Sequence, residues 1–290
     1  MSEVAQLSPG GSRATFRAWL MLSPLLAWLM VFVIAPTAIL LVYSFLTGGE
    51  MGEVRWDFTL QNYRGIFHYV ELQIFLRSLA YAAVTTIICT VAGYPVAYFI
   101  GRSPRRWRGI LLLLVMIPFL TSFLIRAYAW FIILRQNGIL NALLEASRII
   151  PGILPHRIEL LYTPYAVILA LVYTYLPFMI LPIFGSVEKL DESMIEAAAD
   201  LGAGPLRTTL SVILPLTWPG IAGGVILVFV PSVAMFAVTA MMGGGRVVLI
   251  GDAIEQQFLS VGNLPMGAAL GISLLALFLI SALLVQRREI

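Results

Sequence analysis

Few side chains in this sequence are placed to do catalytic chemistry. The lone cysteine, Cys89, lies in an apolar run, and the two histidines, His68 and His156, lie in different polar segments. We therefore expect no disulfide framework, no metal site and no nucleophile–base pair. A phosphate-binding loop needs the pattern G-x-x-x-x-G-K-[ST], but the only lysine, Lys189, directly follows Glu188. The sequence predicts no catalytic residues and no bound cofactor.

The most structured polar segment is 187–216, between two very apolar stretches. Asp191 is a favourable N-cap residue, and Gly202 suits the left-handed position that ends a helix. Pro205 suits the first turn of a second short helix, which ends near Pro215. The pattern predicts two short helices that are too polar to insert into a membrane. Composition leaves two interpretations open: a solvated loop, or a docking element for another protein.

The elements that must position this segment are apolar. The chain is 60% hydrophobic and only 11% charged, and its mean hydropathy is +0.94, whereas soluble domains carry about 25% charged residues. Because a spanning helix needs about 20 apolar residues, we expect an all-α integral membrane protein with six transmembrane helices. The expected spans are roughly 18–45, 76–101, 109–134, 164–186, 217–240 and 265–286.

Arginines fix the expected orientation. The short loop between the second and third spans is basic, and so are the two tails, 1–17 and 287–290; the arginines are Arg102, Arg105, Arg106, Arg108, Arg13, Arg17, Arg287 and Arg288. An even number of spans puts all of them on one side. The positive-inside rule makes that side, and both termini, cytoplasmic. The first apolar run, 18–49, is longer than a signal peptide core and is expected to be a retained span.

Several residues in and near the spans are candidates for a solute path. Pro231 interrupts the fifth span, and a broken spanning helix can mark a path or simply pack closely. Arg126 lies in the third span, roughly 25 Å from its cytoplasmic end if that helix is straight. It could snorkel or line the path. The aromatic candidates, each of which could instead be a packing residue, are Tyr128, Trp130, Tyr173, Tyr175 and Phe236.

Acidic candidates for the path are scarce, because no Asp or Glu lies inside an expected span. Asp252 and Glu255 are three residues apart before the sixth span, on one face if a helix forms there. They could be a solvated face or could attract a cationic solute. The absence of protonatable groups in the spans argues against a secondary transporter. No catalytic cluster supports a membrane enzyme, and a channel is a weaker possibility.

The 187–216 segment carries a specific spacing pattern. A Glu-Ala-Ala triplet is followed after three residues by Gly, after nine more by an aliphatic residue, and after one further residue by Leu-Pro. The residues are Glu196, Ala197, Ala198, Gly202, Val212, Leu214 and Pro215. This pattern resembles the signature loop of ABC importer permeases. The resemblance implies a type I importer fold in which these residues and Asp200 couple to the ATPase subunits.

The resemblance covers most of the chain. The segments "FLRSLAYAAV", "AGYPVAYFIGR" and "PMGAALGISL" look like those of spermidine/putrescine-type permeases. This implies a bacterial inner-membrane permease that imports a polyamine, with an amino-acid-like or other small solute as the alternative. The implied partners are two ATPase subunits that hold ATP and Mg, a second permease subunit that is either identical or different, and a periplasmic solute-binding protein. Lipid surrounds the chain, and no nucleic acid is expected.

Overall fold

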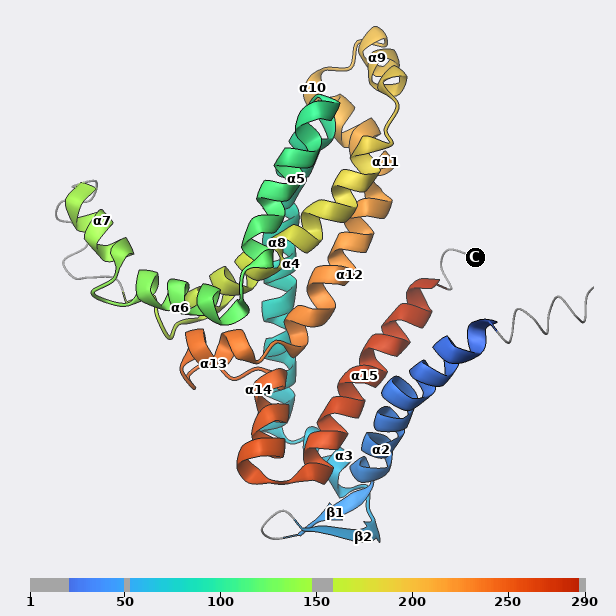
Figure 1. The fold of residues 1–290 in the computed structure, drawn as a ribbon, viewed down its shortest axis with the longest axis vertical. Helices are drawn as coiled ribbons and strands as arrows, with labels where there is room; N and C mark the ends of the chain where they lie inside the picture. Colours follow the sequence, from blue (N-terminus) through green and yellow to red (C-terminus); the bar gives the residue numbers. More distant parts are fainter. Residues whose placement is uncertain (1–20, 50–52, 148–158, 287–290) are drawn as a thin grey trace, which may run out of the picture. The chain divides into compact units, whose positions relative to one another are not determined.

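The structure is a computed structural model that describes residues 21–49, 53–147 and 159–286. Most of these residues are helical, as the sequence predicts (Figure 1). The chain divides into two compact units, Met1–Ile66 with Gln257–Ile290, and Phe67–Gln256. The candidate coupling segment and the candidate path residues all belong to the second unit.

The first unit is built around two apolar helices that pack along each other, α2 and α15. The helix before the hairpin runs from Met21 to Ser44 and includes a π-helical turn. The remaining bounds are η1 (Met30–Ile34), α2 (Ala35–Ser44), β1 (Leu46–Gly48), β2 (Val54–Phe58), α3 (Gln61–Ile66), η4 (Gln256–Val261) and α15 (Leu264–Gln286).

The antiparallel β1–β2 hairpin corrects the expectation of a purely helical chain. Strand β2 alternates two large apolar side chains, Trp56 and Phe58, with charged ones, a pattern that favours a strand over a helix. The Phe58 ring stacks on Phe45 with centroids 5.3 Å apart. The hairpin lies between the first two expected spans, 18–45 and 76–101.

The second unit has a core of three helices, α4 (Tyr69–Arg102), α8 (Pro164–Glu188) and α12 (Trp218–Ala234), which pack on one another. Glycines allow this close approach: Gly93 faces Met179 of α8, and Gly224 of α12 also contacts Met179. Small residues at such crossings are typical of membrane helices. The ends of α4 and α8 and the starts of the neighbouring elements therefore meet at one end of the unit (Figure 1).

The expected continuous third span, 109–134, is wrong. The structure has two helices, α5 (Arg105–Leu120) and α6 (Phe123–Leu134), with a bend of 85°. Pro118 cannot donate a hydrogen bond inside α5, and Thr121 then takes an extended conformation. The straight-helix estimate of the depth of Arg126 is therefore wrong as well, because Arg126 lies beyond the bend. Helix α7 (Ile139–Ser147) follows α6.

The fifth span, expected at 217–240, ends earlier than predicted. Helix α12 stops at Ala234, Met235 is extended, and α13 (Ala237–Gly243) and α14 (Ile250–Glu255) follow. Pro231 lies one turn before this break and is not itself a kink in the middle of a longer helix. The end of α12 leaves the carbonyl group of Pro231 without its helical hydrogen bond, and Tyr175 of α8 donates one to it instead.

Within the described ranges, three helices are long and apolar enough to cross a membrane: Met21–Ser44, Tyr69–Arg102 and Pro164–Glu188. Counting α5–α6 and the bent pair Pro205–Leu216 with Trp218–Ala234 as one span each raises the number among the described residues to five. A further apolar helix, Leu264–Ile280, is shorter. The expected sixth span coincides with α15, and the second begins at Tyr69 rather than near residue 76.

Candidate functional site: the coupling segment and the path residues

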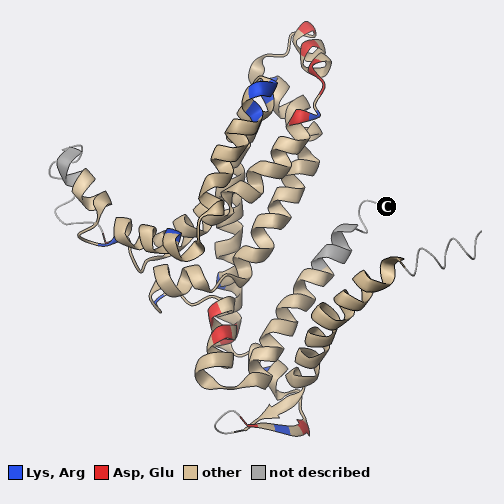
Figure 2. Cartoon of the chain, in the orientation of Figure 1, with Lys and Arg blue, Asp and Glu red and all other residues tan. Residues whose placement is uncertain are grey.

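The polar segment 187–216 folds as the predicted pair of short helices. Helix α9 (Glu192–Asp200) is followed by α10 (Pro205–Thr208), the π-turn η3 (Thr209–Ile213) and α11 (Leu214–Leu216). Asp191 caps α9 by accepting a hydrogen bond from Ser193 N at 3.0 Å, and this bond lowers the pKa of the Asp191 carboxyl. The α9–α11 segment lies at the tip of the unit, where acidic residues gather (Figure 2).

Gly202 makes the tight turn between the two helices. Its φ is +78°, the left-handed conformation that residues with a β-carbon adopt at a cost. Its N–H donates to Ala199 O at 2.9 Å, and the N–H of Ala203 donates to Ala198 O at 3.0 Å, so the last carbonyls of α9 are satisfied. The predicted helix end at Gly202 is confirmed.

The π-turn η3 is explained by the proline that follows it. The N–H of Leu214 bonds to Thr209 O, five residues back, immediately before Pro215. The same arrangement recurs in the first unit, where Ala35 bonds to Met30 O immediately before Pro36. A proline ring clashes with the carbonyl four residues before it, and a wider turn relieves that clash. Leu214 and Pro215 therefore shape the second helix of the segment.

The α9–α11 segment presents a surface that mixes exposed apolar and acidic side chains. Glu196, Ala197 and Asp200 are exposed, while Ala198 is buried against the segment itself. Leu201 is 89% exposed and Leu206 is 74% exposed at the turn. Exposed leucines on a polar tip are unfavourable in water, so this surface is suited to covering by a partner.

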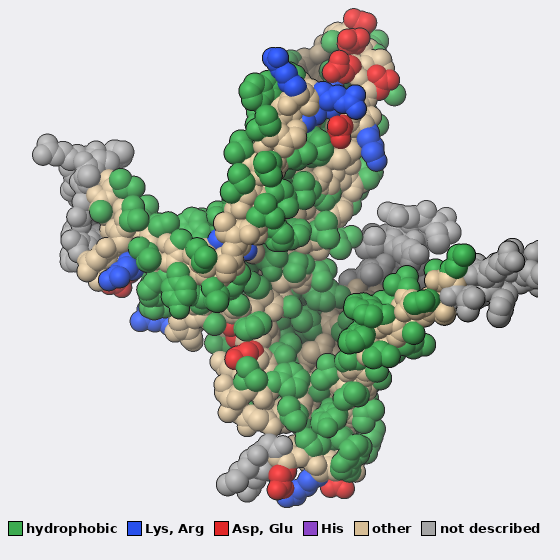
Figure 3. All heavy atoms as spheres, viewed as in Figure 1, with side chains coloured by type: hydrophobic (Ala, Val, Ile, Leu, Met, Phe, Trp, Pro, Cys, Tyr) green, Lys and Arg blue, Asp and Glu red, His purple; other side chains and the backbone are tan. Residues whose placement is uncertain are grey.

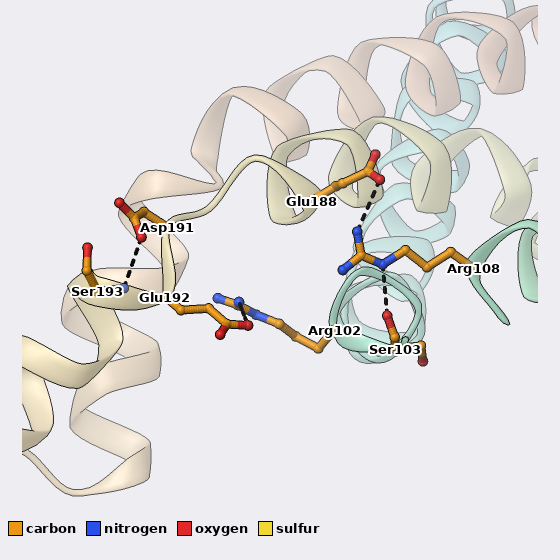
Figure 4. Close-up of polar contacts among 7 residues, drawn as sticks. All are labelled: Arg102, Ser103, Arg108, Glu188, Asp191, Glu192 and Ser193. Carbon is orange, nitrogen blue, oxygen red and sulfur yellow. Dashed lines mark hydrogen bonds and ion pairs between the residues drawn. The ribbon is translucent and has the colours of Figure 1, made fainter. Parts of the chain in front are cut away.

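Two ion pairs join this segment to the end of α4 and the start of α5, and sequence reasoning missed both. Arg102 Nη1 lies 3.2 Å from Glu192 Oε1, and Arg108 Nη1 lies 3.2 Å from Glu188 Oε1 (Figure 4). Arg108 Nε also donates to Ser103 O at 2.8 Å. Two acids near the start of the segment, Glu188 and Glu192, could have indicated these ion pairs, because the basic loop is expected on the same side of the membrane.

The far end of the segment is tied to the helical core. Between α11 and α12 the chain bends by 66° at Thr217, which is fully buried. The Thr217 hydroxyl is 2.9 Å from the Tyr94 hydroxyl of α4. One turn later, a β-carbon at Gly220 would clash with Pro182 O of α8. These contacts connect the end of α11 to all three core helices.

Three candidate path residues come together where α6 meets α8. Arg126, Trp130 and Tyr173 line one small cavity, and the two aromatic rings meet edge to face with centroids 5.4 Å apart. The Arg126 guanidinium lies 5.9 Å from the centre of the Phe119 ring, and its Nε is buried without a hydrogen-bond partner among the described residues. The cavity holds only about 10 Å³, about the space of one water.

The other aromatic candidates and Pro231 do not join this cluster. Tyr128 is 60% exposed and Phe236 is 47% exposed. Tyr175 is buried, and its hydroxyl donates to Pro231 O at 3.2 Å, which satisfies a carbonyl that the end of α12 leaves free. This hydrogen bond gives Tyr175 and Pro231 a role in helix packing that does not depend on a solute.

The acidic candidates, Asp252 and Glu255, do lie one turn apart on α14, but they differ in environment. Asp252 is only 7% exposed, and its carboxylate accepts from Thr239 Oγ1 at 2.6 Å and from Leu249 N at 2.8 Å. Burial raises the pKa of this carboxyl, and the two hydrogen bonds partly offset the rise. Asp252 therefore holds α13 and α14 together, and Glu255, which is half-buried, is the freer acid.

Residues 91–288 match the family described as binding-protein-dependent transport system inner membrane component. The chain belongs to this family. It is 41% identical over 254 residues to the spermidine/putrescine transport system permease protein PotB of Escherichia coli (strain K12), covering 88% of this chain and 91% of that protein. It is 42% identical over 251 residues to PotB of Haemophilus influenzae, covering 87% and 86%.

More distant matches agree with this assignment. The inner membrane ABC transporter permease protein YdcU of Escherichia coli (strain K12) is 32% identical over 274 residues, which cover 90% of this chain and 86% of that protein. A crystal structure of a bacterial ABC transporter involved in the import of the acidic polysaccharide alginate has the same fold, with a TM-score of 0.73 at 17% identity over 95% and 96% of the two chains. The chain is thus a multi-pass inner-membrane permease of an ABC importer.

Proposed function

We propose that this permease imports a polyamine of the spermidine or putrescine type into the bacterial cytoplasm. The supporting observation is the 41% identity to PotB along almost the whole of both chains. Six spans with both termini in the cytoplasm fit the position of the arginine loop beside α9. An amino-acid-like or other small solute is the alternative. It is favoured by Arg126, whose buried Nε has no hydrogen-bond partner in the part of the chain that the structure describes, because a fixed cation opposes a polycation.

Energy comes from outside the chain in this proposal. Two ATPase subunits hold ATP and Mg and hydrolyse the ATP, a periplasmic binding protein delivers the solute, and a second permease subunit completes the pathway. The α9–α11 segment, with Glu196, Ala197, Ala198, Asp200, Gly202, Leu214 and Pro215, is the docking element for an ATPase. Its exposed leucines and acids are the surface to be covered.

In this proposal, the ion pairs connect the docking element to the helices of the permease. When an ATPase moves α9, the Arg102–Glu192 pair moves the end of α4, while the Arg108–Glu188 pair joins the end of α8 to the start of α5. The Glu192 side chain is 80% exposed, so the pair contributes little to stability, about 0–1 kcal/mol. Its role in this proposal is to hold α9 in register with the helices that it must move.

Reconstitution of the complete importer in proteoliposomes tests the proposal. Spermidine or putrescine with the binding protein should stimulate ATP hydrolysis and uptake, and a neutral amino acid should do neither. Stimulation by the amino acid alone would replace the polyamine assignment with the alternative. Uptake driven by an ion gradient without ATPase subunits would overturn the importer assignment itself.

A further inference from the structure

A groove opens where α4 turns into α5, beside the coupling segment but outside it. It has a volume of about 610 Å³. Phe99, Trp107 and Leu111 form an apolar wall, and Tyr98 and Arg102 lie at its polar edge. Phe99 is 65% exposed and Trp107 is 49% exposed. The apolar wall continues down the exposed hydrophobic side of α5, which Figure 3 shows beneath the basic end of that helix.

The basic side chains around this groove are not equally engaged. Arg108 is held by Glu188 and Ser103, and Arg102 uses only Nη1 for Glu192. Arg102 Nε and Nη2 are buried and have no hydrogen-bond partner within the described part of the chain; the guanidinium lies 5.9 Å from the centre of the Tyr98 ring. Exposed Arg106 lies over the Trp107 ring at 5.9 Å and pairs with no described acid.

The chemistry of this groove is that of an anion with an apolar tail. A guanidinium edge formed by Nε and one Nη donates two parallel hydrogen bonds to a phosphate. Buried donors without acceptors are unfavourable, so an oxyanion at Arg102 would remove a cost. Tryptophan and tyrosine favour the level of lipid headgroups, and basic pockets between spanning helices bind anionic headgroups on the cytoplasmic side. A small phosphate would use the arginines but leave the apolar wall exposed.

We propose that this α4–α5 groove binds one anionic phospholipid of the cytoplasmic leaflet. Arg106 makes the first contact with the phosphate, and a small rotation of the Tyr98 ring opens the free edge of Arg102 to it. The acyl chains lie along Phe99 and Leu111. The proposal rests on the cytoplasmic orientation proposed above. Since Arg102 also pairs with Glu192, a bound lipid would fix the arginine that positions α9.

Lipid retention by the assembled importer tests this inference. The complex is placed in nanodiscs of phosphatidylcholine with a minor fraction of phosphatidylglycerol, released, and analysed by native mass spectrometry. The wild type should retain phosphatidylglycerol. The double variant Arg102→Gln/Arg106→Gln should bind it about 10- to 30-fold more weakly, the loss expected for two basic groups near an anionic surface. The matched control, Lys189→Gln/Arg207→Gln, removes two charges near the same end and should retain it.

Further variants and conditions test whether the lipid binds in this groove. Glu192→Gln breaks the ion pair but leaves the groove intact, so it should retain the lipid. Equal retention by the double variant and its control would overturn the proposal, and so would equal retention of phosphatidylcholine. Displacement by millimolar inorganic phosphate would make the site one for a free anion. No retained lipid in the wild-type complex would mean that a protein partner covers the groove. Because lipid is measured rather than transport, a wrong solute leaves the result unaffected.

Discussion

The two glycines in the turn between α9 and α10 differ in backbone conformation. Gly202 has a φ of +78°, whereas Gly204, two residues later, has an ordinary φ of −70°. A β-carbon at either position would meet no atom within 4 Å. Backbone conformation alone therefore distinguishes these two glycines, which makes them a matched pair for mutagenesis.

Gly202→Val should disrupt coupling while Gly204→Val should not. A β-branched residue in the left-handed region costs about 1–3 kcal/mol, so the turn of the Gly202 variant changes shape and its ATPase contact is lost. The variant should remain in the membrane but show reduced solute-stimulated ATP hydrolysis in the reconstituted importer. Normal transport by a well-expressed Gly202→Val variant would count strongly against the docking role of this segment.

Charge exchange tests whether the Arg102–Glu192 ion pair positions α9. Arg102→Glu and Glu192→Arg each place like charges together and should lower coupled ATP hydrolysis up to about fivefold, in line with an exposed pair worth up to about 1 kcal/mol. The double exchange should restore much of the loss. Lys189→Glu, a neighbouring charge reversal outside both ion pairs, serves as the control. If the double variant is no better than the worse single variant, the pair does not position α9.

Helices pack closely where small residues lie at their crossing. On α12, a β-carbon at Gly220 would clash with Pro182 O of α8, whereas one at Gly223 would meet only Pro182 Cβ at 3.7 Å. The two glycines occupy the same helix and face the same neighbour. Of these two glycines, Gly220 is the one that the crossing of α8 and α12 requires.

Gly220→Ala should therefore destabilise the permease, and Gly223→Ala should not. Overpacking at a tight contact costs about 1–3 kcal/mol, while alanine at a tolerant helix position gains up to about 1 kcal/mol over glycine. Thermal unfolding of the purified permease in detergent measures both effects. Similar midpoints for the two variants would mean that α12 can shift away from α8 at little cost.

For the molecule as a whole, the charges of the candidate path residues distinguish the two candidate solutes. Glu255 is the freer acid on α14, because the Asp252 carboxylate already accepts two hydrogen bonds. Arg126 supplies a cation in the α6–α8 cluster. A polycation is attracted by the first and repelled by the second, whereas an anionic or zwitterionic solute can use the arginine.

With a polyamine as solute, Glu255→Gln should slow uptake severalfold and weaken its dependence on salt, since exposed charges are screened over about 8 Å at physiological ionic strength. Arg126→Gln should raise polyamine uptake, because it removes a cation that repels the solute. An amino-acid-like solute should give the opposite result. Uptake into vesicles with the binding protein saturated isolates the permease step. Unchanged uptake in both variants, for either solute, would remove these two residues from the path.

Local sequence was sufficient for features that neighbouring residues alone determine. High hydropathy dictates helices in lipid, because a helix satisfies its own backbone groups, and the cap at Asp191 and the left-handed Gly202 follow from short-range hydrogen bonding. The spacing from Glu196 to Pro215 is equally local and led to the family. Even the approximate positions of the spans at α4, α8 and α15 could be predicted.

Only the tertiary structure decided what depends on distant partners. Pro118 signals a weak point in α5, but the 85° bend depends on the helices against which α5 and α6 pack. Hydropathy could not show that Asp252 is buried and accepts hydrogen bonds from Thr239 and Leu249. Nor could it show that Arg102 and Arg108 pair with acids about 80 to 90 residues away in sequence. Ion pairs and buried hydrogen bonds require two groups at contact distance, and the packing of helices sets that distance.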